Sequence, residues 1–385
     1  MELRHQLQLA YCTNIHRGET WPETLLALET HTLEVKRRVA PRQPYAIGLR
    51  LGAEAVRALG ERETRLHFQR WMEKHDCYVF TINGFPYGQF HGTRVKEQVY
   101  RPTWHEAARL DYTKALFTVL AEILPPGMAG SVSTLPGSCK AFQVTKEEQQ
   151  QMLTQVREAA DFIARLSDRQ GQDLHLGLEP EPLCYMETST ETVEFWQRLG
   201  KNEAVRRCIG VNYDTCHLAV EYETPAEAMA NFKDAGMRIS KLHLSSALQL
   251  TPSDEALHQL RSFTEDTYLH QTIVRHEDGS LVRYLDLPDA LAAAKADPRA
   301  LGEEWRVHFH VPLHALPDLN FGDTRDHLCG VLDVLAAEPG LCQHLEMETY
   351  TWGVLPEELR TANVVDQLQK EYAWCLAELT KRALA

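Results

Sequence analysis

The feature that most constrains the fold of this chain is a repeated order of segments: a short apolar run, a polar loop, a helix-start signal and a long amphipathic stretch. The helix-start signal is the capping-box pattern, in which a Thr hydroxyl and a Glu carboxylate satisfy backbone N–H groups that have no partner inside the helix. Thr followed by Glu three residues later occurs at Thr20, Thr103, Thr145, Thr188 and Thr224. Helices are therefore predicted to begin at these five positions.

Nine short apolar segments alternate with the helical ones and are predicted to be β-strands. They cover residues 7–15, 46–51, 78–83, 131–135, 174–179, 209–214, 239–244, 306–311 and 345–349. Strands that alternate with helices pair in parallel through helical crossovers, and eight such units close into a barrel. We therefore predict an α/β fold, a TIM (β/α)8 barrel that takes residues 1–385 as a single domain, with one of the nine strands outside the barrel.

Residues 248–304 interrupt the alternation of strands and helices. Within them, residues 268–275 and 281–287 flank a turn that contains Asp278 and Gly279, which is the pattern of a β-hairpin. We interpret 248–304 as an insertion late in the chain that packs beside the carboxyl-end mouth of the barrel. The pattern leaves open whether the strand 306–311 belongs to the insertion or to the barrel.

Charge and apolar content restrict the partners of the chain. With 40 basic and 54 acidic side chains, the formal net charge is -14, which repels phosphate backbones, so we expect no nucleic acid partner. The chain has no run of about 18 apolar residues and does not start with the basic-then-apolar order of a signal peptide. We expect a cytoplasmic protein without membrane insertion, and the sequence leaves a homo-oligomer open.

The cysteines indicate reduced thiols. There are nine of them, an odd number, and none forms a C-x-x-C pair, which disfavours a disulfide framework or a structural zinc site. Cys216 lies between Asp214 and His217, but no separate base is evident, so we interpret it as structural and not as a nucleophile.

Period-two alternation within the strands separates an apolar face from a polar face. In the segment 174–179, leucines occupy one face and Glu179 the other, with Glu181 two residues beyond. The same alternation in three further strands sets apart Asp214, His243, Glu346 and Glu348. These polar residues are expected to point into the barrel at the carboxyl ends of the strands, where barrel enzymes build their sites.

Carboxylates gathered at one buried mouth repel one another, and they would be protonated or expelled unless a cation lay between them. A divalent metal ion removes this conflict. Two Glu, one Asp and one His supply a mixed set of oxygen and nitrogen ligands, which suits Mn²⁺, Mg²⁺, Co²⁺ or Zn²⁺. We therefore predict a divalent metal cofactor, and the ligand chemistry leaves its identity open.

Four motifs carry a family resemblance. Gly177-Leu-Glu179, Asp214-Thr-Cys-His217, Leu242-His243-Leu244 and Leu345-Glu-Met-Glu348 resemble, in this order, the motifs of the xylose isomerase-like TIM-barrel superfamily of sugar isomerases and 3-epimerases. The resemblance implies that Glu179, Asp214, His243 and Glu348 bind the metal and that His217 contacts the substrate. By the same resemblance, Glu179 is preferred to Glu181, and Glu348 to Glu346, as a metal ligand.

His310 is an alternative to His243 as the histidine ligand. Apolar residues alternate with His308 and His310 over 307–311, as they would in a strand beside a core. The sequence does not choose between His243 and His310.

The whole chain also resembles a narrower group, the EboE family of bacterial metabolite traffic proteins, which belongs to the same superfamily. This resemblance rests on five segments, residues 11–16 (Tyr-Cys-Thr-Asn-Ile-His), 83–88, 95–97, 308–312 and 345–352. It implies the handling of a small metabolite. The strand of His243 continues into Ser245 and Ser246 where the epimerase pattern has a charged residue.

The loop 85–96 mixes aromatic residues with three potential cations. Such a loop at a barrel mouth could bind an anionic or polyhydroxyl group, and it could equally be a solvated loop. Our predicted substrate-binding residues are His217, His310, His91, Arg94, Lys96 and Glu181.

Three functions fit these observations. The leading one is a metal-dependent isomerase or epimerase of a small sugar-like hydroxy-carbonyl compound, in which Glu179 and Glu348 are the catalytic residues that exchange a carbon-bound proton. The second is a metal-dependent hydrolase of the endonuclease IV-like kind, which His308, His310 and His314 favour. The third is a protein that binds and hands over a metabolite without catalysis.

Overall fold

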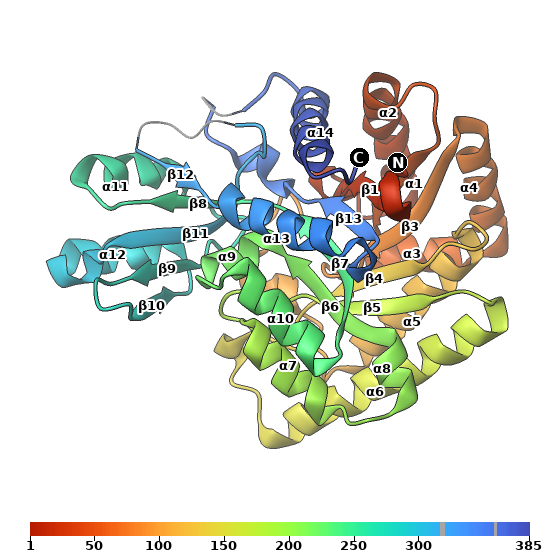
Figure 1. The fold of residues 1–385 in the computed structure, drawn as a ribbon, viewed down its shortest axis with the longest axis horizontal. Helices are drawn as coiled ribbons and strands as arrows, with labels where there is room; N and C mark the ends of the chain where they lie inside the picture. The colour runs from red at the N-terminus through yellow and green to blue at the C-terminus, as the bar shows by residue number, and fades with distance from the viewer. Residues whose placement is uncertain (316–319, 358–359) are drawn as a thin grey trace.

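Eight parallel strands form the centre of the molecule (Figure 1). The structure is a computed structural model that describes residues 1–315, 320–357 and 360–385. The strand order in this sheet is β1-β13-β7-β6-β5-β4-β3-β2. The strands are β1 (Gln8–Tyr11), β2 (Tyr45–Arg50), β3 (Cys77–Asn83), β4 (Gly130–Thr134), β5 (Leu174–Leu178), β6 (Ile209–Asp214), β7 (Arg238–Leu244) and β13 (His344–Met347).

The sheet closes on itself almost completely. β1 and β2 stand at the two ends of the strand order, and a parallel bridge between Cys12 and Gly48 joins them. A Cβ atom at Gly48 would lie only 2.6 Å from the backbone oxygen of Tyr11, so glycine permits this close approach. The predicted TIM barrel is confirmed.

Amphipathic helices surround the barrel (Figure 1). In α6, for example, Met152, Val156 and Ile163 recur at helical spacing and are buried. A π-helical segment, Leu28–Thr32, joins α1 to α2. The helices around the barrel are α1 (Trp21–Ala27), α2 (Leu33–Val39), α3 (Ala53–Gly60), α4 (Arg62–His75), α5 (Ala107–Ile123), α6 (Lys146–Gln170), α7 (Ser189–Arg198), α8 (Glu203–Cys208), α9 (Thr215–Val220), α10 (Pro225–Ala235), α13 (Arg325–Ala337) and α14 (Val364–Lys381).

Four of the five helix-start signals lie directly before a helix. At Thr20 and Thr145 both bonds of the capping box are present, and α1 and α6 begin at the next residue. The Thr188 hydroxyl accepts the backbone N–H of Glu191 at the start of α7. Thr224 directly precedes α10, although its hydroxyl makes no bond to the helix backbone.

The fifth signal, at Thr103, gave a wrong prediction of the helix start. The Glu106 carboxylate does accept the Thr103 N–H, at 2.7 Å. However, the Glu106 N–H donates to the Thr103 oxygen and closes a tight turn there (3.0 Å). The chain therefore enters the helix later, and α5 begins at Ala107 with Glu106 as the residue before it.

The inserted segment builds a second, antiparallel sheet beside the barrel (Figure 1). Its strand order is β10-β9-β11-β8-β12, and it carries two further helices. The predicted hairpin is present as β9 and β10, in which Val274 lies opposite Val282. The elements of the insertion are β8 (Ala247–Leu250), α11 (Asp254–Leu260), β9 (Thr272–Arg275), β10 (Leu281–Tyr284), α12 (Leu287–Ala296), β11 (Glu304–His310) and β12 (Gly322–Asp323).

The strand that the sequence left unassigned, β11, belongs to this second sheet. It pairs antiparallel with both β8 and β9, which a strand of the parallel barrel could not do. The second sheet therefore runs beyond residue 304, as far as β12.

Two apolar clusters lie inside the molecule. The larger one fills the space between the barrel sheet and the surrounding helices. The smaller one lies within the insertion and includes the fully buried Trp305 and Phe309. Trp352, which follows β13, packs against both clusters and so links the insertion to the barrel.

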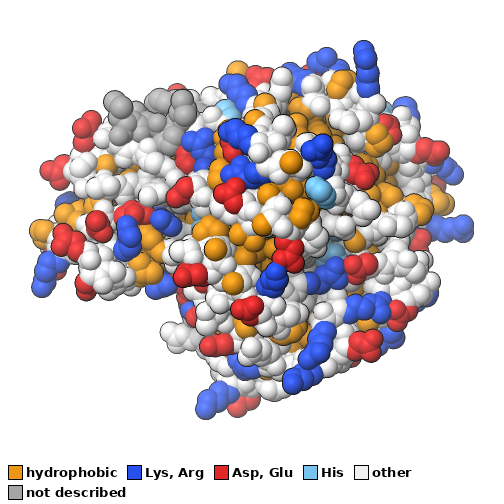
Figure 2. Space-filling model, viewed as in Figure 1, with side chains coloured by type: hydrophobic (Ala, Val, Ile, Leu, Met, Phe, Trp, Pro, Cys, Tyr) orange, Lys and Arg blue, Asp and Glu red, His pale blue; other side chains and the backbone are white. Residues whose placement is uncertain are grey.

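The visible surface mixes both signs of charge. In Figure 2, Lys and Arg side chains are interspersed with Asp and Glu side chains over the face shown. Over the described ranges, no helix is both long enough and apolar enough to cross a membrane.

Candidate metal centre

Four buried side chains meet at the carboxyl ends of neighbouring barrel strands. Glu179 directly follows β5, Asp214 ends β6, His243 lies near the end of β7, and Glu348 directly follows β13. One potential ligand atom of each residue lies within 4.8 Å of those of the other three. These four residues, called the quartet below, are the four predicted metal ligands, and the barrel brings them together from positions 179 to 348.

His243 lies at the centre of the quartet. Its Nδ1 is 3.0 Å from Glu179 Oε1, 3.3 Å from Asp214 Oδ2 and 3.0 Å from Glu348 Oε2. Burial alone would lower the pKa of His243, but the Glu348 and Glu179 carboxylates raise this pKa well above its ordinary value. The three carboxylates thus surround a position that favours positive charge.

Glu346 contacts the other ring nitrogen of His243. Glu346 Oε2 lies 2.9 Å from His243 Nε2 and 2.6 Å from Lys241 Nζ. Burial alone would raise the pKa of Glu346, but the charge of Lys241 holds this pKa at about 2. An ionised Glu346 accepts the Nε2 proton and leaves Nδ1 facing the quartet, which is how metal-binding histidines are usually oriented. Glu346 is therefore placed to orient His243.

Two amides hold the Glu348 carboxylate. Asn14 Nδ2 and Asn83 Nδ2 donate to Glu348 Oε1 at 2.8 and 2.9 Å. By contrast, Glu179 Oε2 and Asp214 Oδ2 are buried and have no hydrogen-bond partner among the residues that the structure describes. Buried carboxylate oxygens without a partner are costly, and an oxygen-rich set with one imidazole matches the ligand preference of divalent cations. The quartet fits a divalent metal ion.

The start of α9 fixes the other oxygen of Asp214. Asp214 Oδ1 accepts the backbone N–H groups of Cys216 (2.7 Å) and His217 (3.1 Å) and the Ser245 hydroxyl (2.6 Å). Burial alone would raise the pKa of Asp214, but the neighbouring His217 and His243 rings hold this pKa well below its usual range. Asp214 is thus an ionised carboxylate with Oδ2 available to the quartet. Ser245, which departs from the epimerase pattern, helps to hold it.

A pocket opens at the quartet, and Glu179 and Glu348 form part of its lining. Much of the remaining wall is aromatic and comes from the segment after β3, from the insertion and from the segment after β13: Phe85, Phe90, Tyr100, Tyr268 and Tyr350. The insertion therefore supplies part of the pocket that covers the quartet.

Comparison with solved structures identifies the fold. The chain superposes on D-psicose 3-epimerase from Clostridium cellulolyticum H10, solved with D-tagatose, with a TM-score of 0.53 and 12% identity over 98% of this chain and 99% of that one. A xylose isomerase domain protein from Planctomyces limnophilus gives a TM-score of 0.50 and 15% identity over 91% of both chains. The probable 3-DHS dehydratase AsbF from Bacillus anthracis gives 0.50 and 12% identity, over 96% of this chain and 99% of that one.

The fold is that of the xylose isomerase-like TIM barrels. These identities are too low to carry an activity over to this chain. No protein-family model matches the sequence, and no curated protein matches it.

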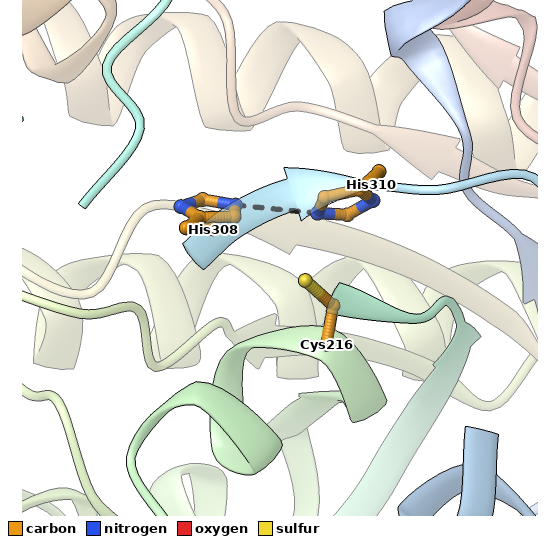
Figure 3. Close-up of side chains that lie close together, drawn as sticks. All are labelled: Cys216, His308 and His310. Carbon is orange, nitrogen blue, oxygen red and sulfur yellow. Dashed lines mark hydrogen bonds between the residues drawn. The ribbon is translucent and has the colours of Figure 1, made fainter. Parts of the chain in front are cut away.

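A group of histidines lies next to the quartet of this xylose isomerase-like barrel. His217 follows Asp214 by three residues, and its Nε2 lies 3.9 Å from Asp214 Oδ2. His310 forms a group with Asp214 and His217, and a second group with Cys216 and His308 (Figure 3). The structure thus places His243 in the quartet and His310 beside it, although the sequence left the two as alternatives.

Burial sets the protonation of His217 and His308. It lowers the pKa of His217, and Asp214 only partly offsets this effect. It also lowers the pKa of His308 well below its ordinary value, with His217 and His310 adding to the decrease. The two imidazoles are therefore neutral at neutral pH.

Glu181 lies in the pocket but outside the quartet. The Tyr100 hydroxyl donates to Glu181 Oε1 at 2.6 Å, and Gln271 Nε2 donates to the same atom at 3.1 Å. Burial raises the pKa of Glu181 to about 8. A carboxyl group with this pKa can serve as a hydrogen-bond donor near neutral pH.

The three cationic candidates of the loop after β3 lie in three different environments. Lys96 is buried and lines the pocket, but it is paired with Asp286 at 2.6 Å. His91 contacts the Asn14 oxygen and the Tyr268 hydroxyl, and it lines an outer groove. Arg94 is exposed and lines a separate surface depression. Of the three, Lys96 is the one that the structure brings to the pocket.

Sequence reasoning did not assign several residues of this site. Asn14 and Asn83 lie within two of the segments that carried the family resemblance, and a polar residue at the end of a predicted strand was the signal available for Asn83. Lys241 is a charged residue on the polar face of β7, two residues before His243, so strand alternation could have indicated it. Tyr268 comes from the insertion, and nothing in its local sequence places it at the barrel mouth.

Proposed function

We propose that this protein is a metal-dependent isomerase or epimerase of a small, sugar-like hydroxy-carbonyl metabolite. The observation that carries the proposal is the quartet of three carboxylates and one imidazole, with Glu179 Oε2 buried and without a hydrogen-bond partner in the described part of the chain. A carboxylate oxygen of this kind at the edge of a pocket is suited to accept a proton from a bound substrate.

Glu179, Asp214, His243 and Glu348 would hold a divalent ion, one of Mn²⁺, Mg²⁺, Co²⁺ or Zn²⁺. When bound, such an ion supplies Lewis-acid polarisation of a carbonyl and a neighbouring hydroxyl, which acidifies the carbon-bound hydrogen between them. Glu346 and Lys241 keep the His243 ring in one orientation through the 2.9 Å contact at Nε2.

The two catalytic glutamates differ in how they are held, which suits different tasks. Glu348 is anchored by Asn14 and Asn83, so its Oε1 is fixed in place by two donors. Glu179 has only one oxygen engaged, by His243. We assign Glu179 to the removal of the carbon-bound proton and Glu348 to its return on the other side of the substrate.

The pocket would bind the substrate through both polar and aromatic groups. His217 presents its Nε2, because Nδ1 is 2.9 Å from the Pro180 oxygen and donates to it. His217, Glu181 and Lys96 all line the pocket. The aromatic walls would pack on the apolar face of a sugar ring or of a larger group attached to it.

Proton transfer is tested with ketoses and their phosphates in heavy water, followed by NMR. We expect deuterium at one carbon of the substrate that is turned over, and we expect Glu348→Gln to lose this exchange because an amide cannot accept the proton and also replaces a carboxylate of the quartet. Glu194→Gln, at an exposed position on α7, is the matched control and should exchange at the wild-type rate. Turnover of any of these compounds without deuterium incorporation would refute the mechanism.

A hydrolase of the endonuclease IV-like kind is the second candidate, and the histidine group of His217, His308 and His310 beside the quartet is the observation that favours it. Histidine-rich metal sites activate water. Membership of the EboE family, implied by sequence resemblance, supports a third interpretation in which the pocket binds and transfers a metabolite. Stoichiometric binding without turnover would separate this carrier from both enzymes.

A further inference from the structure

Three buried side chains outside the quartet direct metal-binding atoms toward one another. The thiol of Cys216 and one ring nitrogen each of His308 and His310 lie within 4.8 Å of one another. Cys216 belongs to α9 of the barrel, whereas both histidines belong to β11 of the insertion. In Figure 3 the Cys216 thiol points toward the two rings. The group therefore joins the two parts of the molecule.

The hydrogen bonds of His310 show which of its nitrogens is free. His310 Nδ1 lies 2.7 Å from the backbone oxygen of Glu348. A carbonyl oxygen can only accept, so Nδ1 carries the ring proton. With the ring proton on Nδ1, Nε2 is the ring nitrogen that offers a lone pair.

The same holds for His308. Its Nδ1 lies 2.8 Å from Gln271 Oε1. The Gln271 amide is oriented by its nitrogen, which donates to the Tyr100 hydroxyl (2.7 Å) and to the Pro182 oxygen (3.2 Å). The oxygen of this amide therefore faces His308, Nδ1 is the donor, and Nε2 again carries the lone pair.

The two free nitrogens face each other. His308 Nε2 and His310 Nε2 are 3.2 Å apart (Figure 3). Two lone pairs at this distance repel unless a cation is shared between them. Two imidazole nitrogens bound to one tetrahedral zinc ion are about 3.3 Å apart, and a bound thiolate sulfur would lie about 3.6 Å from each. The observed separation of the nitrogens matches this geometry.

We propose that Cys216, His308 and His310 form a second cation site, which takes zinc or another divalent transition metal ion that accepts a sulfur ligand. Three protein ligands leave the fourth position of a tetrahedral ion for water or substrate. His308 lines the pocket, so this position would open onto the same space as the quartet. His310 also groups with Asp214 and His217, so the second site adjoins the first.

The two sites differ in ligand chemistry, and this makes them separable. The quartet offers carboxylate oxygens and one nitrogen, whereas the second site offers two nitrogens and a sulfur. A thiolate ligand gives bound Co²⁺ an intense near-ultraviolet charge-transfer band, which oxygen and nitrogen ligands do not give. The inference does not rest on the proposed isomerase activity.

The test is a titration of the metal-stripped full-length protein with Co²⁺, read by absorption and by the amount of cobalt retained after gel filtration. We expect two equivalents and the thiolate band. Cys216→Ser and His308→Asn should each lose the band and one equivalent; Asn keeps a donor near the position of Nδ1 and removes Nε2. Cys208→Ser, at a buried cysteine before β6, is the control and should keep the thiolate band and both equivalents of cobalt.

A Glu348→Gln variant separates the two sites, since it should lose the equivalent held by the quartet and keep the band. If saturating cobalt gives the wild-type protein no thiolate band, the second site does not exist, whatever the variants do. A band that survives Cys216→Ser would also overturn the proposal. If the wild-type protein shows the thiolate band but binds only one equivalent of cobalt, the second site is supported and the quartet does not bind the metal.

Discussion

The barrel and the insertion contribute different chemistry to one pocket. Four neighbouring barrel strands deliver three carboxylates and one imidazole, and each strand supplies one group at its carboxyl end. The insertion delivers two histidines from a single strand, two residues apart on the same face of β11. A parallel barrel thus gathers residues that are distant in sequence, whereas an added antiparallel strand supplies a local pair. The histidine pair is therefore the part of the site that depends on the insertion.

The largest expected effect comes from a ligand of the quartet. Asp214→Ala should abolish the retention of Mn²⁺ by the quartet, because it removes one of the three carboxylates. The loss in affinity should exceed the roughly 100-fold that removal of an outer partner costs. Metal content after dialysis is the measurement. A full equivalent of Mn²⁺ on this variant would show that the quartet is assigned wrongly, because Mn²⁺ prefers oxygen ligands and does not need the sulfur and nitrogen group.

The next effect distinguishes the barrel histidine from the insertion histidine. His243→Ala should cost the quartet at least about 100-fold in metal affinity, because the ring is the nitrogen ligand. His310→Ala should leave the quartet able to bind Mn²⁺ or Mg²⁺, since these ions do not need the sulfur and nitrogen group. Titration of both variants with Mn²⁺ gives the comparison. Loss of binding in His310→Ala with retention in His243→Ala would reverse the assignment.

The third prediction concerns an ion pair that joins the two parts. Arg283 of the insertion pairs with Glu221 (2.6 Å) and Glu187 (3.0 Å) of the barrel. Arg283→Met leaves the buried Glu221 carboxyl group without its cation, while Glu187 keeps its pair with Lys140, so we expect a loss of about 3 kcal/mol in the free energy of unfolding at alkaline pH. Arg299→Met, at an exposed arginine, is the control and should change stability little.

The loss of stability in Arg283→Met should depend on pH. Burial raises the pKa of Glu221 to about 8, Glu187 adds to the increase, and Arg283 opposes it. The folded protein then holds a proton that the unfolded chain releases above about pH 4.5, so this group makes stability fall as pH rises toward 8. Without Arg283 the pKa of Glu221 should rise further, so the fall in stability should continue to a higher pH. The measurement is the free energy of unfolding in denaturant, for the wild-type protein and for Arg283→Met, at acidic and at alkaline pH. If the two proteins differ by the same free energy at both pH values, this account is wrong.

The smallest effect is expected at Glu346, which contacts only the far side of the His243 ring. Glu346→Gln keeps a hydrogen-bond acceptor at His243 Nε2 but removes the charge, so quartet affinity should fall by about 10-fold. Calorimetric titration with Mn²⁺ gives the value. A loss as large as that of Asp214→Ala would mean that Glu346 is itself a metal ligand.

The barrel, and the meeting of four polar side chains at its mouth, could be predicted from the sequence because both depend on local signals. Alternation within each strand puts Glu179, Asp214, His243 and Glu348 on the polar face, and the barrel topology brings strand ends together. The strand with His308 and His310 shows the limit. Its alternation is the same in a barrel and in an antiparallel sheet, so only tertiary pairing with β8 and β9 could assign it.

The loop after β3 shows a second limit of sequence reasoning. Lys96 and Arg94 are similar cations two residues apart, yet Lys96 is buried against Asp286 and Arg94 faces solvent. Asp286 lies in the insertion, nearly 200 residues along the chain. The partner that distinguishes the two side chains is therefore remote in sequence, and no pattern within the loop contains this information.

The place of β13 in the barrel has a consequence for biosynthesis. β13 lies between β1 and β7 in the barrel. The sheet therefore cannot connect β1 to β7 until β13 has left the ribosome. Glu348 follows this strand, at position 348 of 385. A nascent chain therefore carries Glu179, Asp214 and His243 without the fourth member until residue 348 has been added. Loading of the quartet with metal must follow the synthesis of β13 and of Glu348 after it.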